Sequence, residues 1–190
     1  MVLCGSSAGS NLLLAACQDS RLLSKVLGVA GIYPLVDWAE DGEAKMARRP
    51  DPTIPDFIGD TYAGLSRLYL DAEQSQSMTD ARVSPAYFAD RKALPPQILL
   101  VGAEHDMFCH EDEMMADKLA DMAGGVKDKT KTGWKAAGVQ WSKIMGQPHA
   151  FDAFPAKAPV TEDSRLAAVD ELYSVVSEWL TSVFATSAVK

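Results

Sequence analysis

Residues 2–17 place the strongest constraint on the fold, because a short apolar strand passes through a glycine-flanked turn directly into a helix. Residues 2–4 predict the strand, residues 5–9 (Gly-Ser-Ser-Ala-Gly) the turn, and residues 8–17 the helix, since Ala and Leu lose little entropy in a helix. A turn this sharp needs small residues two places before and two places after its centre, and the two glycines meet that need. Ser7 is therefore expected to project from a strained elbow between strand and helix.

Two further apolar runs, 26–33 and 97–101, show no polar alternation. Such runs are typical of strands covered on both faces, and so of a parallel sheet. We also expect a strand at 139–145 and helices at 111–122 and 161–184, the last with an apolar stripe at three- and four-residue spacing. Strands that alternate with helices predict an α/β fold with a mainly parallel sheet.

Two stretches do not fit this alternation. Residues 37–84 are rich in proline and charge, with one short amphipathic piece at 62–70, and predict a cap-like excursion from the sheet. Residues 124–138 are rich in Gly and Lys and predict a loop. The length of 190 residues is typical of one domain, so residues 1–190 are expected to form a single α/β domain.

Composition excludes several classes of function. The formal net charge of −8 argues against nucleic-acid and anionic-membrane surfaces, because both need clustered Lys and Arg. The three cysteines are an odd number without a CxxC pair, so we expect no disulfide framework, no structural zinc and a cytoplasmic location. No apolar run approaches the roughly 18 residues of a membrane span. The polar run 110–113 predicts a solvated helix start and not a metal site, since adjacent helical residues point in different directions.

A serine nucleophile needs a base that accepts its proton and a third group that orients the base. Among the three histidines, His149 follows the strand expected at 139–145, and Asp106 follows the strand expected at 97–101. Open α/β sheets bind ligands at the carboxyl ends of strands, and Ser-Asp-His is the chain order of triads built on a G-x-S-x-G elbow. We therefore expect Ser7, Asp106 and His149 to converge at one rim of the sheet. The alternatives without a catalytic role are a turn serine with no function for Ser7, a helix-capping or turn aspartate for Asp106, and a partly buried loop histidine for His149.

These segments resemble the hormone-sensitive-lipase-like esterases of the α/β-hydrolase superfamily (alpha/beta hydrolase fold-3). The elbow is similar to that family's G-D-S-A-G-G-N-L, and the later segments are similar to its D-x-L-x-D-E and H-G-F. The resemblance covers nearly the whole chain and assigns the acid to Asp106 and the base to His149. The segments that carry it are GSSAGSNL (5–12), SP (84–85), LPPQILLVG (94–102), DMFCHE (106–111) and HAF (149–151).

The resemblance implies lipase-like hydrolysis of a small-molecule carboxylic ester through an acyl-serine intermediate, with no metal or organic cofactor. The backbone N–H of Ala8, at the start of the helix, would face the developing oxyanion. Ser6, Ser10, His110 and Ala150 depart from the family pattern, where Asp, Gly, Asp and Gly stand, and none of them is a triad member. In the family the excursion helps to cover the acyl pocket, which makes Tyr62 and Tyr69 candidate substrate-pocket residues; their spacing is also typical of packing.

The family's HGGG-type loop, which supplies most of its oxyanion hole, has no match, because the chain begins inside the strand that leads to Ser7. We expect a partial α/β-hydrolase fold that lacks its N-terminal strands, from a fragment or a shortened chain. Losing an oxyanion donor costs roughly 10²- to 10³-fold in rate, and an uncovered strand edge favours self-association. Two alternatives to an active esterase remain: a catalytically silent half-domain that acts by association, and an amidase or peptidase on the same fold.

Overall fold

The structure is a computed structural model that describes residues 1–59, 61–70 and 77–188, so residues 60 and 71–76 of the predicted excursion lie outside it. Within the described residues the strands form one six-stranded sheet in the order β1-β2-β3-β6-β5-β4. Strands β1, β2, β3 and β6 run parallel, while β5 pairs antiparallel with both β6 and β4. The strands are β1 (Val2–Ser6), β2 (Gly28–Ile32), β3 (Gln97–Ala103), β4 (Asp128–Lys129), β5 (Gly133–Ala136) and β6 (Val139–Ile144).

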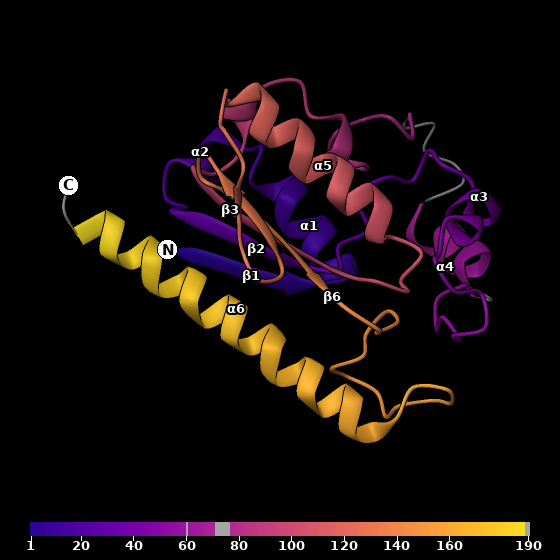
Figure 1. The fold of residues 1–190 in the computed structure, drawn as a ribbon. Helices are drawn as coiled ribbons and strands as arrows, with labels where there is room; N and C mark the ends of the chain where they lie inside the picture. Colours follow the sequence, from indigo (N-terminus) through magenta and orange to yellow (C-terminus); the bar gives the residue numbers. More distant parts are fainter. Residues whose placement is uncertain (60, 71–76, 189–190) are drawn as a thin grey trace.

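Helices cover both faces of the parallel part of the sheet (Figure 1). Helices α1 and α5 pack on one face, and the long helix α6 crosses the other. Helices α3 and α4 lie beyond one end of the sheet. No helix in the described part of the chain is both long and apolar enough to cross a membrane. The helices are α1 (Ala8–Ala16), α2 (Ser20–Leu23), α3 (Gly42–Ala47), α4 (Tyr62–Tyr69), α5 (Cys109–Met122) and α6 (Glu162–Ala188), with 3₁₀ turns at Pro85–Tyr87 and Arg91–Ala93.

The central strands are buried on both faces, as their uninterrupted apolar sequences predict. Ile98 and Leu100 of β3 pack in the core shared with α1 and α5, whereas Leu99 and Val101 pack in the core shared with α6. Successive strand residues point to opposite faces, so one strand supplies both cores. The predicted α/β fold with a mainly parallel sheet and flanking helices is confirmed.

The topology brings the candidate site residues to one edge of the sheet. Parallel strands all end on the same side, and Ser7, Asp106 and His149 follow the carboxyl ends of β1, β3 and β6. Residues 37–59, which follow β2, begin at this same edge and carry helix α3. The sheet thus sets the distances between the candidate site residues, and the loops that follow the strands surround them.

One expectation about local structure is wrong. The stretch predicted as a loop, 124–138, contains β4 and β5, which extend the sheet with an antiparallel hairpin. Strands β5 and β6 are joined by Ala137 and Gly138, both at positive φ (45° and 81°), the conformation that suits tight two-residue hairpin turns. This turn and the alternation of Trp134, Lys135 and Ala136 are hairpin signals that the high Gly and Lys content obscured.

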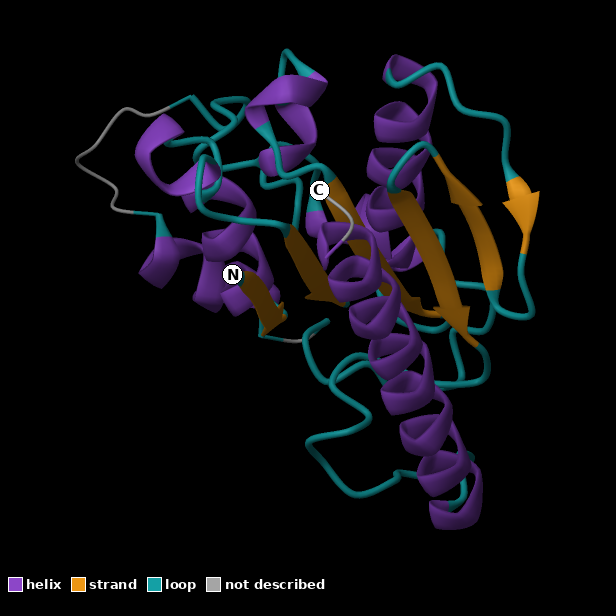
Figure 2. Ribbon diagram, turned by 90° about the vertical axis from the view of Figure 1, so that its left-hand side faces the viewer, coloured by secondary structure: helices purple, strands orange, loops and turns teal. Residues whose placement is uncertain are grey.

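Strand β1 is one edge strand of the sheet, and the β4–β5 hairpin forms the opposite edge (Figure 2). In the described residues β1 pairs only with β2. Val2 and Leu3 are partly buried, and Cys4 is exposed along this strand. An unpaired edge of this kind can accept another strand by backbone hydrogen bonding.

Candidate active site

Ser7 lies at the elbow between β1 and α1 in a strained backbone conformation, with φ 51° and ψ −125°. Its N–H continues the β1–β2 ladder by donating to the Ile32 carbonyl oxygen at 2.9 Å. A Cβ at Gly5 would lie 2.9 Å from the backbone of Gly9, which explains the glycine at that position. A Cβ at Gly9 would meet nothing within 4 Å among the described residues, so the steric argument is wrong for that glycine.

The three predicted residues form a continuous hydrogen-bonded chain. The His149 Nε2 atom lies 2.9 Å from the Ser7 Oγ, and the His149 Nδ1 atom lies 2.7 Å from the Asp106 Oδ2. His149 is 3% exposed and Asp106 is 2% exposed, whereas Ser7 is partly open. Burial by itself would lower the pKa of His149, but the adjacent Asp106 carboxylate, together with Asp56 and Asp152, outweighs it, and the pKa of the imidazole is raised. The arrangement can therefore take a proton from the Ser7 hydroxyl and stabilise the resulting imidazolium.

The loop that carries Asp106 (the acid loop) and the loop that carries His149 (the base loop) are hydrogen-bonded to each other. Asp106 Oδ1 accepts the backbone N–H of Phe108 at 2.9 Å, which leaves Oδ2 for the imidazole. The His105 N–H donates to the Gln147 carbonyl oxygen at 2.9 Å and so joins the acid loop to the base loop. These bonds fix which carboxylate oxygen faces His149.

Tyr33, the first residue after β2, supports the imidazole from the side. Its ring packs edge-on against His149 with centroids 4.8 Å apart, and its hydroxyl donates a hydrogen bond to the Asp152 carboxylate. Phe108 meets the imidazole edge-on at 5.4 Å. Ala150 has φ 55°, a conformation that favours glycine, at the position where the resembled family has the glycine of H-G-F.

A family comparison decides the assignment of the chain. The model of a family described as "alpha/beta hydrolase fold" matches residues 1–151, and these residues contain the whole hydrogen-bonded chain from Ser7 to Asp106. The chain belongs to the alpha/beta hydrolase fold family. The resemblance drawn from the sequence motifs is thereby confirmed. A search of curated proteins finds no match.

Solved structures with this fold include several esterases. A hyperthermophilic esterase from Pyrobaculum calidifontis is 25% identical, with a TM-score of 0.62 over 93% of this chain and 52% of that one. An ester hydrolase from the metagenome of Lake Arreo is 18% identical, with a TM-score of 0.65 over 97% and 50%. Carboxyl esterase 2 from the fungus Tuber melanosporum is 18% identical, with a TM-score of 0.61 over 93% and 51%. The chain thus spans about half the length of these structures.

The excursion of this alpha/beta hydrolase contacts the acid loop directly. Arg49 Nε donates to the His105 carbonyl oxygen at 2.6 Å, and Asp56 Oδ2 accepts the Met107 N–H at 2.8 Å. Arg49 and Asp56 are themselves 3.8 Å apart as a buried ion pair. Backbone groups on both sides of Asp106 are therefore bonded to the excursion, a role that sequence reasoning missed.

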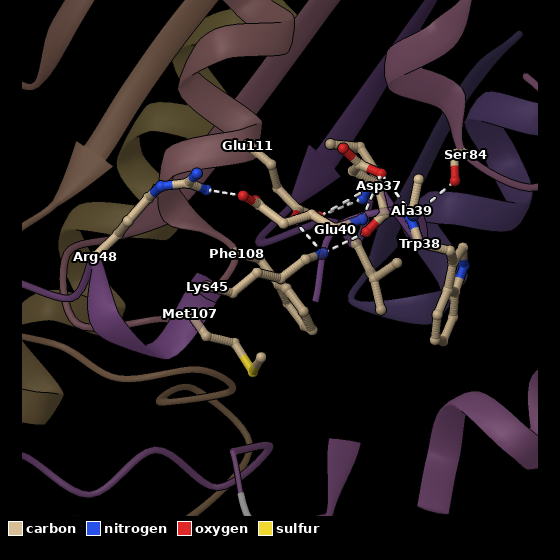
Figure 3. A network of polar contacts seen from close by, with 12 residues as sticks. Asp37, Trp38, Ala39, Glu40, Lys45, Arg48, Ser84, Met107, Phe108 and Glu111 are labelled. Carbon is tan, nitrogen blue, oxygen red and sulfur yellow. Dashed lines mark hydrogen bonds and ion pairs between the residues drawn. The ribbon is translucent and has the colours of Figure 1, made fainter. Parts of the chain in front are cut away.

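A second buried ion pair joins α3 to α5, next to Phe108 (Figure 3). Glu111 accepts the N–H groups of Val36 at 2.8 Å and Asp37 at 3.1 Å, and its carboxylate pairs closely with the Lys45 ammonium. The Lys45 ammonium also donates to the Asp37 carbonyl oxygen. The loop that leaves β2 is thereby tied to the start of α5.

The expectation of a solvated helix start at 110–113 is wrong for two residues. Glu111 is 7% exposed and Asp112 is fully buried. Burial raises the pKa of Glu111 against the opposing effect of Lys45, and burial also raises the pKa of Asp112. In the part of the chain that the structure describes, no three or more His, Cys, Asp or Glu side chains gather closely enough to hold one metal ion.

The backbone N–H of Ala8 lies at the first residue of α1. The first N–H groups of a helix have no acceptor inside it, and the helix dipole places partial positive charge there. Ala8 is exposed and directly follows Ser7, and its role as an oxyanion donor stays a prediction. Ser10, a departure from the family pattern, donates its hydroxyl to the Gly5 carbonyl oxygen at 2.5 Å and accepts the Ile32 N–H at 3.1 Å, which braces the elbow.

The two candidate substrate-pocket tyrosines both stack on one tryptophan. Trp38 lies 5.8 Å from Tyr62 and 4.9 Å from Tyr69, measured between ring centroids. Tyr62 also lines a cavity of about 1070 Å³ together with Trp38, whereas Ser7 and His149 are not among the described residues that line it. The Tyr69 hydroxyl donates to Asn11 of α1 at 2.7 Å. A role for either tyrosine in binding substrate stays a prediction.

Proposed function

We propose that the protein is a serine hydrolase that cleaves carboxylic esters through an acyl-serine intermediate. The single observation that carries the proposal is the hydrogen-bonded chain from Asp106 through His149 to Ser7, with contacts of 2.7 and 2.9 Å. It unites a nucleophile, a base and an orienting acid in the order that a G-x-S-x-G elbow requires. Membership of a family whose solved structures include esterases supports the ester as substrate.

The mechanism follows from the roles that these positions permit. Ser7 Oγ attacks the ester carbonyl carbon while His149 Nε2 takes the hydroxyl proton. Asp106 holds the Nδ1–H tautomer of His149 and stabilises the imidazolium. The N–H of Ala8 donates to the oxyanion. Collapse of the tetrahedral intermediate breaks the bond to the alcohol oxygen, which takes the proton from His149. Water then attacks the acyl-serine in the same way: His149 takes the proton of the water and returns it to Ser7 Oγ as the carboxylic acid leaves.

A fluorophosphonate probe tests the nucleophile. We expect covalent labelling of the 190-residue chain that is lost in Ser7→Ala and retained in Ser6→Ala, the exposed serine next to it. The same two variants are compared for hydrolysis of p-nitrophenyl acetate. Labelling and turnover that survive in Ser7→Ala would contradict the assignment.

The unpaired edge of β1 favours a second candidate, a catalytically silent domain that acts by association through that edge. Size-exclusion chromatography combined with p-nitrophenyl ester turnover distinguishes the two. A monomer with rapid, Ser7-dependent turnover contradicts the silent domain, and an oligomer without turnover contradicts the esterase. Parallel assays with p-nitroanilide substrates separate an esterase from an amidase, which the triad alone does not distinguish.

A further inference from the structure

Tyr33 has a strained backbone directly after β2. Its φ of 36° lies in the left-handed region, where a bulky side chain is rarely found. Its N–H donates to the Val101 carbonyl oxygen of β3 at 2.6 Å, and the residue is 2% exposed, so its surroundings hold it in this conformation. Strained residues gather at functional sites, where the surrounding structure over-determines them. The contacts of the Tyr33 side chain agree with a role of this kind.

The Tyr33 side chain contacts the base loop at three points. Its ring meets the imidazole of His149 edge-on, with centroids 4.8 Å apart and ring planes at 62°. The same ring meets Phe151 edge-on at 6.2 Å. Its hydroxyl donates to the Asp152 carboxylate, three residues after His149. One side chain from the end of β2 therefore contacts both the base and the residues that follow it.

The other contacts of the base loop lead to different elements. The Gln147 carbonyl oxygen accepts the His105 N–H of the acid loop at 2.9 Å. The Phe151 carbonyl oxygen accepts a hydrogen bond from Arg165 of α6 at 3.1 Å. The base loop is thus fixed to the acid loop, to α6 and, through Tyr33, to the end of β2. The third link is the one that also touches the imidazole ring.

The Tyr33 hydroxyl also holds a charge near the imidazole. Burial lowers the pKa of His149, whereas three carboxylates raise it. The largest of these effects comes from Asp106, and Asp56 and Asp152 add to it. The phenol of Tyr33 adds no charge of its own, because burial and the bond to Asp152 raise its pKa. When His149 takes the serine proton it becomes positively charged, so the carboxylate that Tyr33 holds stabilises the reacting state.

We propose that Tyr33 and Asp152 act together as positioning residues for His149. The Tyr33 ring holds the imidazole in line with the nucleophile, and the Tyr33 hydroxyl holds the Asp152 carboxylate where it stabilises the imidazolium. The inference rests on the proposed serine-hydrolase function and adds to it two residues that act through the base. Removing either partner should consequently slow the chemical step and leave substrate binding as it is.

Three variants separate the hydrogen bond from the charge. Tyr33→Phe keeps the ring and removes the donor, Asp152→Asn keeps an acceptor and removes the charge, and the double variant lacks both. With p-nitrophenyl acetate we expect kcat and kcat/KM to fall together about fivefold in each single variant, with KM unchanged. Because both changes break one pair, the double variant should lose about fivefold and not the roughly 25-fold of independent effects.

Matched controls come from exposed residues of α6. Tyr173→Phe and Asp163→Asn make the same chemical changes on side chains in contact with solvent, and both should leave the rates unchanged. Circular dichroism checks that each variant keeps the fold. Should Tyr33→Phe fail to fold, Asp152→Asn carries the test alone, because Asp152 is only partly buried.

The pKa of His149, followed by NMR titration of the ¹⁵N-labelled imidazole, is a readout that does not need turnover. The chain has three histidines, so the signal is assigned by its loss in His149→Gln. We expect the pKa of His149 to be lower in Asp152→Asn and in Tyr33→Phe than in the unaltered chain. The two control variants should leave it unchanged.

The outcomes separate this inference from the proposed function. Ser7-dependent turnover with unchanged rates in fold-intact Tyr33→Phe and Asp152→Asn overturns the positioning role and leaves the esterase in place. A slower rate with an unchanged pKa of His149 overturns it too, since a merely structural role would have that effect. Losses that multiply in the double variant, or a change in KM alone, refute the joint action on the chemical step.

The proposed function fails separately, if fluorophosphonate labelling survives in Ser7→Ala. In a chain that hydrolyses no ester, the NMR titration decides on the inference. A pKa of His149 that falls in both Tyr33→Phe and Asp152→Asn supports the pair, and an unchanged pKa refutes it.

Discussion

Replacing Asp106 by Asn tests the link between acid and base with almost no change in shape. Asp106 Oδ1 accepts the Phe108 N–H, and an asparagine oxygen can keep that bond. Its amide nitrogen would then take the place of Oδ2, 2.7 Å from His149 Nδ1. Because an amide N–H₂ only donates, Nδ1 would become the acceptor and the ring proton would move to Nε2. A protonated Nε2 cannot accept the proton of Ser7.

The magnitude follows from the charge that is removed. With charge centres about 4 Å apart and an effective dielectric constant of about 20, the carboxylate stabilises the imidazolium by about 4 kcal/mol. That corresponds to about 10³-fold in rate, and the wrong tautomer adds to it, so we expect kcat/KM to fall about 10³- to 10⁴-fold in Asp106→Asn.

The assay is p-nitrophenyl acetate hydrolysis at pH 8, with circular dichroism to check that the fold is kept. Asp163→Asn, in the first turn of α6, is a matched control that removes an exposed carboxylate and should leave the rate unchanged. A fold-intact Asp106→Asn variant that loses less than about tenfold would refute the reasoning, since neither the charge nor the tautomer could then govern the step.

Three further predictions follow from the geometry. Since the pKa of His149 is raised above its usual 6.5 and the base must be neutral, kcat/KM should fall with decreasing pH through a midpoint above 6.5, measured as a pH–rate profile. Lys45→Met should lower the free energy of unfolding by about 3–5 kcal/mol in urea titrations, because it leaves the Glu111 carboxylate buried without its cation. Gly102→Ala should lower it by about 1–3 kcal/mol, because the added Cβ would lie 2.5 Å from the buried Trp141 ring.

Each of these has a control inside the chain. The acid limb of the pH profile should move to lower pH in Asp106→Asn, which removes the main group that raises the pKa of His149. The double variant Lys45→Met/Glu111→Gln should recover part of the lost stability, since it leaves no unpaired charge. Gly64→Ala in α4, where an added Cβ meets nothing within 4 Å, should not destabilise the protein. An equal loss in Gly64→Ala and Gly102→Ala would contradict the steric reasoning.

The sequence was sufficient for the four parallel strands and for the meeting of Ser7, Asp106 and His149 at one edge, because their signals are local. Strands β2 and β3 are apolar without alternation, and burial on both faces requires that pattern. The elbow at Ser7 is a steric signal within five residues, and Asp106 and His149 follow strands that end at the same edge. Parallel pairing alone then places all three residues at one rim.

What the sequence did not reveal depends on partners far along the chain. Glu111 stands in an acidic helix start, a pattern typical of solvent exposure, yet its ligands are the N–H groups of Val36 and Asp37 and the Lys45 ammonium. Nothing near Glu111 in the sequence indicates these groups. Burial of a charge is decided by tertiary contacts, and local patterns do not encode them.

The excursion therefore has a part in the geometry of the site that its cap-like composition did not suggest. Two of the three site residues lie on loops, and loops are normally the most mobile parts of a fold. Here Arg49 and Asp56 bond backbone groups on both sides of Asp106, and the His105 N–H joins that loop to the one that carries His149. The backbone on both sides of Asp106 is consequently held by a segment about 50 residues earlier in the chain. Changes in residues 49–56 should act on the rate of the chemical step, through the position of Asp106, more than on the binding of substrate.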